Sequence, residues 1–579
     1  MLMPAIKSSA AMLIASYAFA AQAATPVISV RPNILLILAD DLGYSDLGVF
    51  GGEIHTPNLD ALAASGRVLS NFHSSATGAP ARAMILTGKD HHQVGLGSTA
   101  EAMATMILRD RQVQDGSDRL TFSKRPSGYE GYLKSDSPNL PQMLKKAGYH
   151  TYMAGKWHLA VEPVQPSAES QGMPFKFEPR SFPKSTGFES SFALLTGGFL
   201  HFSLPSGMPA PYIENDAPAQ VPADFYSSTF YTDKLLQYID ANKGDGKPFF
   251  AYAAYTAPHA PLQAPQEIIA HYKGQYDKGY EVVQLRRLAR QRTLGLISAK
   301  FSPSVGVNDA LGRPRWGQLS DAQRASEARK MEIYAAMVEE LDTNIGRLIQ
   351  HLKEIGEYER TVIVFTSDNG PDGSSPPAPP GVDNSLENLG RVTSATMYGE
   401  RWAEVSATPF KLWKGYPTEG GLSVPLIVRL PGQQATRAPI SDLTHVLDLH
   451  PTLLEVAGLS QPASHNTRSE HVYFEGISLL TRLMGKTHMP VRSGSDVLAD
   501  ELYGGRYIIH GDWKLESVQP PFGDGNWALY NIRTDRGESV DRRSSEPGIA
   551  DRLTKEWDFY ASHVGVVSTQ FSPDRGPLP

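Results

Sequence analysis

The strongest constraint on the fold is a short, continuously apolar stretch that ends at two aspartates. Residues 33–38 read Asn-Ile-Leu-Leu-Ile-Leu, and Ala39 leads directly into Asp40 and Asp41. A strand that is apolar at consecutive positions, and not only at every second one, is typical of a parallel sheet covered on both faces. The chain is therefore expected to bury a central sheet, with the two aspartates at the end of one strand.

Helices alternate with further strands of this kind through most of the chain. Helices are predicted after Thr56-Pro57, after Ser137-Pro138 and over 225–239, and strands over 150–153, 249–252 and 361–365. A long helix with one buried face is predicted from the spacing of Met331, Ala335, Val338, Ile345, Leu348 and Leu352. This alternation indicates an α/β fold with a large, mostly parallel central sheet sandwiched by helices.

The chain is expected to divide into three parts, because 579 residues are too many for one compact core. Lys7, a short apolar stretch and small residues up to Ala23 predict a signal peptide over 1–23, and the apolar stretch is too short to span a bilayer. An α/β catalytic domain is expected over 24–460. Short segments broken by Gly and Asp predict a smaller antiparallel sheet with a closing helix over 461–579. The expected location is the periplasm or the outside of the cell.

Charge and cysteine content exclude several classes of function. The formal net charge is -7 and the pI about 6.2, which argues against nucleic acid or an anionic membrane as a partner. An anionic ligand would have to be attracted by a local cluster of positive charge. The absence of cysteine excludes disulfides, thiolate metal sites and a thiol nucleophile.

Acidic residues follow two of the predicted buried strands. Asp40 and Asp41 end the first, and Asp368 and Asn369 end a later one. Open α/β sheets bind ligands at the carboxyl ends of their strands, and adjacent carboxylates repel each other unless a cation lies between them. Three carboxylates and an amide oxygen suit Ca²⁺ or Mg²⁺ better than zinc. Alternatively, each cluster is an ordinary turn, since Asp, Asn and Gly all favour turns.

The segment over 76–88, Ala-Thr-Gly-Ala-Pro-Ala-Arg-Ala-Met-Ile-Leu-Thr-Gly, resembles the signature of the type I sulfatases of the alkaline phosphatase superfamily. In that signature a cysteine or serine stands two residues before proline and four before arginine. The resemblance covers almost the whole of the predicted mature chain and is closest to bacterial arylsulfatases. Other matching motifs are Arg31-Pro32-Asn33, Asp40-Asp41-Leu42-Gly43, Thr56-Pro57-Asn58-Leu59-Asp60, Asp90-His91-His92, Gly155-Lys156-Trp157-His158, Ala257-Pro258-His259, Ser367-Asp368-Asn369-Gly370 and Gly511-Asp512-Trp513-Lys514.

The resemblance implies a metal site and a set of catalytic residues. The positions that bind one Ca²⁺ in the family, with Mg²⁺ as an alternative, match Asp40, Asp41, Asp368 and Asn369. Arg82 matches the arginine that holds the nucleophile and the acidic ligands in register.

The resemblance also implies residues that act on the ester. Lys156 and Lys414 match lysines that hold the sulfate oxygens. His259 matches the histidine that protonates the leaving alcohol, and His158 the one that handles the nucleophile's hydroxyl. Cleavage of a sulfate ester builds negative charge on the leaving oxygen, so cations on the sulfate and an acid on the leaving group suit its transition state.

The chain departs from the family at the nucleophile, where Gly78 stands. In the family a formylglycine-generating enzyme oxidises this cysteine, and the hydrated aldehyde attacks sulfur with one hydroxyl and expels sulfate with the other. Glycine can do neither, and attack by metal-activated water would be much slower. Three explanations remain open: a natural protein that binds without cutting, a deliberately disabled variant, or a modified residue written as glycine.

Three classes of function therefore compete. The first is a sulfuric ester hydrolase acting on a small sulfated ester, with formylglycine at position 78. The second is a catalytically dead relative that binds sulfated ligands. The third is a phosphoryl-transfer relative, which the single hard-cation set disfavours, because such enzymes usually have a Ser or Thr nucleophile and two zinc ions held by several His and Asp.

Overall fold

The structure is a computed structural model that describes residues 31–110, 125–168, 170, 172–203, 211–301, 303, 306–433, 438–460 and 476–567. The predicted signal peptide over 1–23 lies outside these residues. Within them, no helix combines the length and apolar character needed to cross a membrane.

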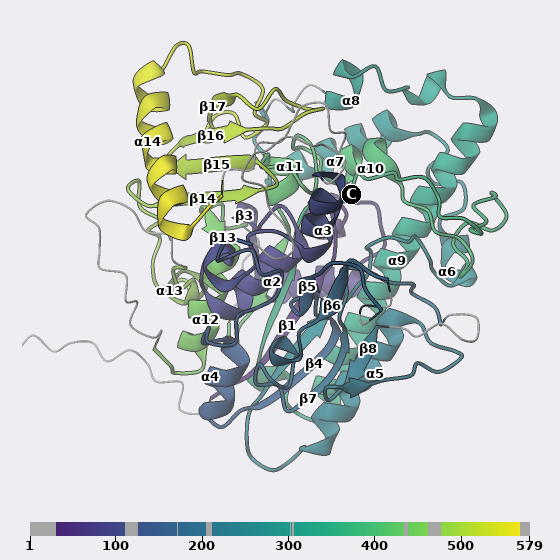
Figure 1. The fold of residues 1–579 in the computed structure, drawn as a ribbon, viewed down its shortest axis with the longest axis vertical. Helices are drawn as coiled ribbons and strands as arrows, with labels where there is room; N and C mark the ends of the chain where they lie inside the picture. Colours follow the sequence, from purple (N-terminus) through teal and green to yellow (C-terminus); the bar gives the residue numbers. More distant parts are fainter. Residues whose placement is uncertain are drawn as a thin grey trace, which may run out of the picture.

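A nine-stranded sheet forms the centre of the molecule (Figure 1). Its five middle strands are parallel, as predicted, whereas the strands at both edges pair antiparallel. The spatial order is β2 (Arg67–Leu69), β12 (Leu426–Arg429), β11 (Thr361–Ser367), β1 (Asn33–Ala39), β10 (Phe249–Ala254), β4 (His150–Lys156), β7 (Ser190–Leu194), β8 (Tyr212–Glu214) and β9 (Ala217–Pro218).

Helices cover both faces of this sheet. The first strand shows why, because Leu35 and Ile37 contribute to one hydrophobic core and Leu36 and Leu38 to another. The first core includes residues of α1 (Pro57–Ser65), α5 (Ser227–Ala241), α6 (Gln266–His271), α7 (Tyr280–Thr293), α9 (Asp321–Glu354) and α10 (Gly399–Ser406). The second includes residues of α2 (Gly78–Thr87), α4 (Leu140–Lys146), α12 (Leu449–Val456) and α13 (Leu480–Leu483). The helix-covered parallel sheet predicted from the sequence is confirmed.

The predicted helices are present, with small differences at their ends. The helix expected after Ser137-Pro138 begins at Leu140, because the Asn139 side chain accepts a hydrogen bond from the backbone N–H of Gln142 and caps it. Thr56 precedes α1 without capping it, since its hydroxyl accepts from the backbone of Gly48. Further elements are α3 (Ala100–Asp110), α8 (Val307–Ala310), α11 (Glu419–Leu422), β3 (Phe72–His73), β5 (Val161–Pro163), β6 (Phe175–Phe177) and β13 (Thr444–His445).

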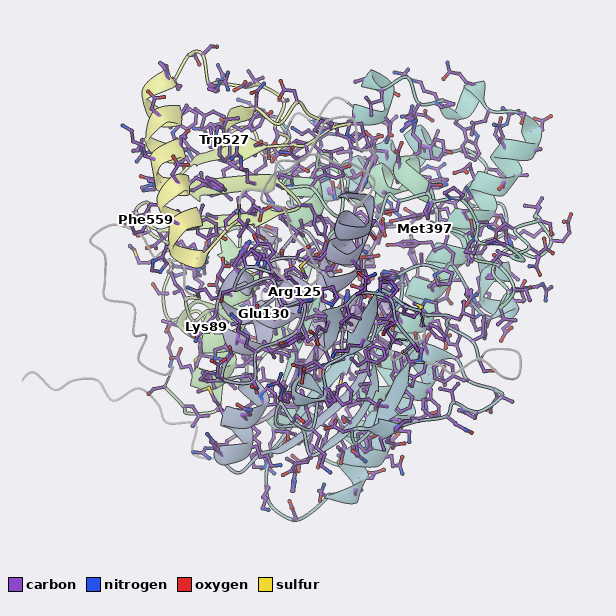
Figure 2. All side chains as sticks on the ribbon, viewed as in Figure 1. Lys89, Arg125, Glu130, Met397, Trp527 and Phe559 are labelled. Atoms are coloured by element: carbon purple, nitrogen blue, oxygen red, sulfur yellow. The ribbon has the colours of Figure 1, made fainter. Side chains whose placement is uncertain are left out.

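A second, four-stranded antiparallel sheet lies at one end of the molecule, with helix α14 (Pro547–Val564) packed on it (Figure 1). Trp527 on this sheet packs edge-on against Trp557 of α14, with ring centroids 5.5 Å apart, whereas Phe559 of the same helix is exposed (Figure 2). The strands are β14 (Val497–Leu502), β15 (Gly505–His510), β16 (Trp513–Ser517) and β17 (Trp527–Asn531). The sheet and helix agree with the sequence, and the boundary between residues 460 and 461 stays a prediction.

Candidate functional site

Candidate site residues follow four of the five parallel strands at one edge of the central sheet. Because the carboxyl ends of parallel strands meet at the same edge, residues distant in sequence come together there. Asp40 and Asp41 follow β1, Lys156 and His158 end or follow β4, His259 follows β10, and Asp368 and Asn369 follow β11.

The four predicted metal ligands are buried and contact one another. The Asn369 amide donates to Asp41 Oδ1 at 2.6 Å, and the Asp41 backbone N–H donates to Asp368 Oδ1 at 3.3 Å. Asp41 has a φ of 65°, a left-handed conformation that non-glycine residues seldom adopt. Ligand atoms of Asp40, Asp41 and His259 also lie within 4.8 Å of one another, so the structure adds a histidine to the predicted cluster.

The four predicted ligands, Asp40, Asp41, Asp368 and Asn369, form the acidic cluster of the site. Each of its three carboxylates is paired with a cationic side chain. Lys156 Nζ lies 2.7 Å from Asp40 Oδ2, and Lys414 Nζ lies 2.9 Å from Asp41 Oδ2. Arg82 donates twice to Asp368 Oδ2, at 2.7 and 3.0 Å. The two predicted sulfate-binding lysines and the predicted arginine are thus brought to the acidic residues, and they place positive charge at this edge of the sheet.

The donors of the acidic cluster fit a hard cation. Among the described residues, neither Asp40 Oδ1 nor Asn369 Oδ1 has a hydrogen-bond partner, although both atoms are buried. Burial raises the pKa of Asp40 to about 7, with a further contribution from the Asp368 carboxylate. A bound cation would satisfy the two oxygens and favour the ionised carboxylate, and the oxygen donors of the four predicted ligands suit Ca²⁺ or Mg²⁺.

Gly78 is the first residue of α2 and faces the acidic cluster. A Cβ atom built on Gly78 would lie 2.4 Å from Asp368 Oδ2 and 3.5 Å from Asn369 Oδ1. A side chain at position 78 would therefore extend toward the predicted metal ligands. Such a side chain fits only if the Asp368 carboxylate turns away. At present Arg82 holds this carboxylate too close to the position of a Cβ atom on residue 78.

The two predicted proton-transfer histidines lie in different surroundings. His158 Nε2 is 3.1 Å from Glu101 Oε2, and burial lowers the pKa of His158. His259 Nδ1 is 2.5 Å from the carbonyl oxygen of Ala260, its Nε2 is 3.6 Å from Asp41 Oδ2, and burial lowers its pKa to about 4. His259 is thus neutral at neutral pH, and it could protonate a leaving group only if a bound anion raised its pKa.

Two acidic residues of the site were missed by sequence reasoning. Glu101 lies in the first turn of α3 and contacts His158, and Asp372 Oδ2 lies 3.3 Å from Lys414 Nζ. Although burial opposes it, the Lys414 ammonium holds the pKa of Asp372 at about 2. Asp372 follows the Asp368-Asn369-Gly370 turn so closely that its position was a usable signal, whereas nothing in the sequence links Glu101 to His158.

A pocket opens beside the acidic cluster, with about 210 Å³ of empty space that is partly continuous with solvent. Its walls are mostly apolar or aromatic, and Met397, labelled in Figure 2, belongs to them. The lining residues are Asp41, Pro258, Ala260, Leu262, Tyr334, Asp372, Met397 and Tyr398.

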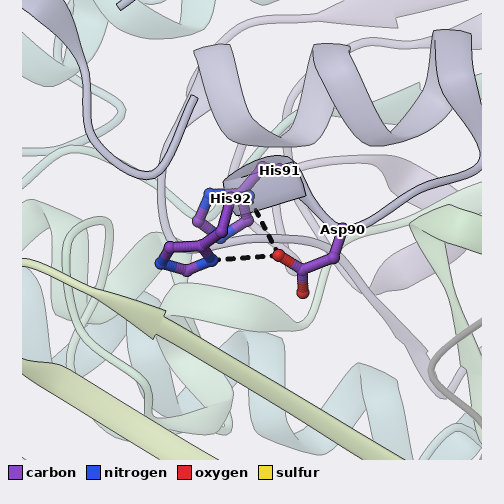
Figure 3. Close-up of side chains that lie close together, drawn as sticks. All are labelled: Asp90, His91 and His92. Atoms are coloured by element: carbon purple, nitrogen blue, oxygen red, sulfur yellow. Dashed lines mark hydrogen bonds and ion pairs between the residues drawn. The ribbon is translucent and has the colours of Figure 1, made fainter. Parts of the chain in front are cut away.

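The Asp90-His91-His92 segment after α2 is part of a buried ionic network (Figure 3). His92 Nδ1 lies 2.9 Å from Asp90 Oδ1, and His91 Nε2 lies 2.6 Å from Asp500 Oδ1. His92 Nε2 also lies 3.2 Å from Glu501 Oε2. Since Asp500 and Glu501 belong to β14, these histidines join the small sheet to the segment that follows the Gly78 helix.

Comparison with known proteins gives consistent relatives. The family model described as Sulfatase matches residues 32–459. An uncharacterized sulfatase of Schizosaccharomyces pombe is 38% identical over 93% of this chain and 95% of its own length. An arylsulfatase of Klebsiella aerogenes is 36% identical over 79% of this chain and 91% of its own length.

Solved structures share the fold. The crystal structure of Ps i-CgsB in complex with k-i-k-neocarrahexaose aligns with a TM-score of 0.61 at 22% identity, over 92% of this chain and 93% of that one. A structure in complex with its substrate D-glucosamine-2-N,6-O-disulfate aligns with a TM-score of 0.54 at 20% identity, over 94% of this chain and 100% of that one. At these identities the likeness concerns the fold.

Proposed function

The chain belongs to the sulfatase family, and from this we propose that it is a sulfuric ester hydrolase of the arylsulfatase type. The reaction would convert a small sulfated ester to an alcohol or phenol and sulfate. The observation that carries the proposal is the pairing of Lys156 and Lys414 with the acidic cluster at the sheet edge, beside two histidines. An aryl group is favoured by the relatedness to an arylsulfatase.

Each residue has a role that its surroundings support. Lys156 and Lys414 would hold the sulfate oxygens, and Arg82 fixes Asp368. His158 would accept a proton from the nucleophile, and His259 would protonate the leaving oxygen once substrate charge has raised its pKa. Sulfatases are generally metal dependent, and a cation held by the acidic cluster would stabilise negative charge on the sulfate. Its donors favour Ca²⁺, with Mg²⁺ as the alternative.

The identity of residue 78 decides between catalysis and binding. With formylglycine there, the chain would hydrolyse esters, and a formylglycine-generating enzyme would be its partner. With glycine, the same groups would bind a sulfated ligand without efficient cleavage, which is the alternative function. The intact acidic cluster, lysines and histidines favour the hydrolase. The periplasm or the outside of the cell remains the proposed location, based on the predicted signal peptide.

Removing both lysines is expected to abolish sulfate binding. The Lys156→Ala, Lys414→Ala variant should lose most of its affinity for inorganic sulfate or an aryl sulfate, because these ammonium groups supply the local positive charge. Titration calorimetry at two ionic strengths measures this, and the intact protein should bind less tightly at the higher one.

Lys234→Ala is the control for the loss of a partly exposed, ion-paired lysine. The Lys234 side chain is 17% exposed and pairs with Glu214 of β8, and the Lys414 side chain is similarly exposed, at 19%, whereas that of Lys156 is buried. Equal sulfate affinity in the double variant, Lys234→Ala and the unchanged protein would disprove the anion site.

Chelation of divalent cations is expected to lower the melting temperature. A ligand that binds only the folded state, present at about 100-fold excess over its dissociation constant, contributes roughly 2.7 kcal/mol. Melting curves with and without a chelator, followed by Ca²⁺ or Mg²⁺ addition and elemental analysis, test the metal site. An unchanged melting temperature together with no bound calcium or magnesium would contradict it.

A further inference from the structure

Two neighbouring glycines lie against the two candidate proton-transfer histidines. Gly197 and Gly198 follow β7, the remaining strand of the five parallel ones. A Cβ atom on Gly197 would lie 2.8 Å from Cε1 and 2.9 Å from Nε2 of His158. A Cβ atom on Gly198 would lie 2.7 Å from Cε1 and 3.0 Å from Nδ1 of His259. Each of these contacts is too close for a real side chain.

These contacts involve the imidazole rings and not the backbone. The three nearest atoms at each glycine all belong to the ring, and neither glycine has the left-handed φ that would itself require glycine. The backbone conformation at 197 and 198 is therefore compatible with alanine. The atoms nearest to the added methyl group would be those of the histidine ring. What the missing side chains provide is room for the two rings.

The ring nitrogen nearest to each glycine is also held by a polar contact. Glu101 Oε2 holds His158 Nε2 at 3.1 Å. The His158 Nδ1 atom is buried and has no hydrogen-bond partner within the part of the chain that the structure describes. The carbonyl oxygen of Ala260 holds His259 Nδ1 at 2.5 Å. A ring pushed away from its glycine would have to strain or break this contact.

The glycine loop is also tied to the loop that carries His259. The His201 backbone N–H donates to Gln263 Oε1 at 2.9 Å, and His201 Nε2 lies 2.9 Å from the carbonyl oxygen of His259. Ser227 Oγ lies 2.7 Å from the other ring nitrogen of this fully buried histidine. The glycine loop and the loop that carries His259 are thus held together, which limits how far Gly198 can move from the His259 ring.

We propose that Gly197 and Gly198 are positioning residues, and that this one dipeptide sets the places of both His158 and His259. The inference rests on the proposed function only for its catalytic consequence, because the positions of the rings can be measured without turnover.

The test uses the whole chain labelled with ¹⁵N-histidine, with ring signals assigned from His158→Gln and His259→Gln. Gly197→Ala should shift the ring signals of His158 and leave those of His259, and Gly198→Ala should do the reverse. Gly317→Ala is the matched control, since no atom lies within 4 Å of its added Cβ and its φ is ordinary. Unmoved signals for the ring facing each new methyl group would overturn the proposal.

Stability provides a second measurement that holds even if a single variant folds poorly. The loss of melting temperature caused by Gly197→Ala should disappear when His158→Ala removes the ring, and likewise for Gly198→Ala with His259→Ala. An equal loss with and without the ring would show that the glycines serve the backbone, and the proposal would be wrong.

The catalytic consequence is measured in a Gly78→Cys background matured to formylglycine. A displacement of about 1 Å can cost about 100-fold in rate. Gly197→Ala should therefore slow the hydrolysis of aryl and alkyl sulfates to the same extent. Gly198→Ala should slow the hydrolysis of alkyl sulfates more, because an alkoxide is a poor leaving group and depends on protonation by His259. Failure of the matured protein to cut any ester would contradict the proposed function and leave the ring measurements standing.

Discussion

Gly78→Cys, co-expressed with a formylglycine-generating enzyme, is expected to hydrolyse a chromogenic aryl sulfate far faster than the chain as written. Loss of the nucleophile costs a serine hydrolase about 10⁶-fold in turnover, so its restoration here should gain at least about 10³-fold. Asp368 must turn to admit the new side chain, since the added Cβ would lie 2.4 Å from its Oδ2. Because Asp368 is also a predicted Ca²⁺ ligand, the assay includes calcium. Mass spectrometry confirms that the introduced cysteine has been converted to formylglycine.

Gly78→Ser, expressed without any maturation system, is the companion variant, because its single hydroxyl lacks the second one needed to release sulfate. It should cut at most once and remain as a sulfated protein. If the matured cysteine variant binds sulfate but stays inactive, the binding function becomes the better description. Full activity of the glycine chain would instead replace the covalent mechanism with attack by water.

Arg82→Met is expected to destabilise the protein by roughly 3–5 kcal/mol, the usual cost of removing one partner from a buried ion pair. Arg82 and Asp368 are both inaccessible to solvent, and the guanidinium, against the effect of burial, holds the pKa of Asp368 below its usual range. Without it, a buried carboxylate faces Asp40 and Asp41 unpaired. Urea denaturation measures the change in the free energy of unfolding.

Arg180→Met is the control for Arg82→Met. Its side chain is 71% exposed and pairs with Glu178 on the surface, so the free energy of unfolding should hardly change. Added Ca²⁺ should restore part of the stability of Arg82→Met, because a cation can take over the charge of the guanidinium. A variant as stable as the unchanged protein in the presence of a chelator would refute the structural role of Arg82.

Much of the site could be predicted because its residues follow buried strands. Continuous apolar runs identified β1 and β11, and parallel pairing places their ends side by side, so Asp40 and Asp368 could be expected to meet. The lysines and histidines required the family signature, since a single Lys or His after a strand carries little information.

The missed residues have a common physical cause. Glu101 of α3 contacts His158, and Gly198 lies against His259, and both depend on the paths of loops that no sequence periodicity predicts. The sequence does not distinguish a glycine that leaves room for a neighbouring ring from a glycine that is required by a turn. The partners of His91 and His92 were equally hidden, because they lie 409 residues further along the chain.

The ionic network around the Asp90-His91-His92 segment has a consequence for the order in which the protein can form during synthesis. Ser75, three residues before Gly78, donates to Asp500, and Asp90 accepts a hydrogen bond from Tyr560 at 2.7 Å. The ribosome makes residue 560 long after every strand of the central sheet has been completed. Until then, Asp90, which follows the Gly78 helix, lacks its contact with Tyr560, and until β14 has been made Ser75, which precedes this helix, lacks its contact with Asp500. The contacts that flank residue 78 on both sides can therefore be completed only after every strand of the central sheet has been synthesised.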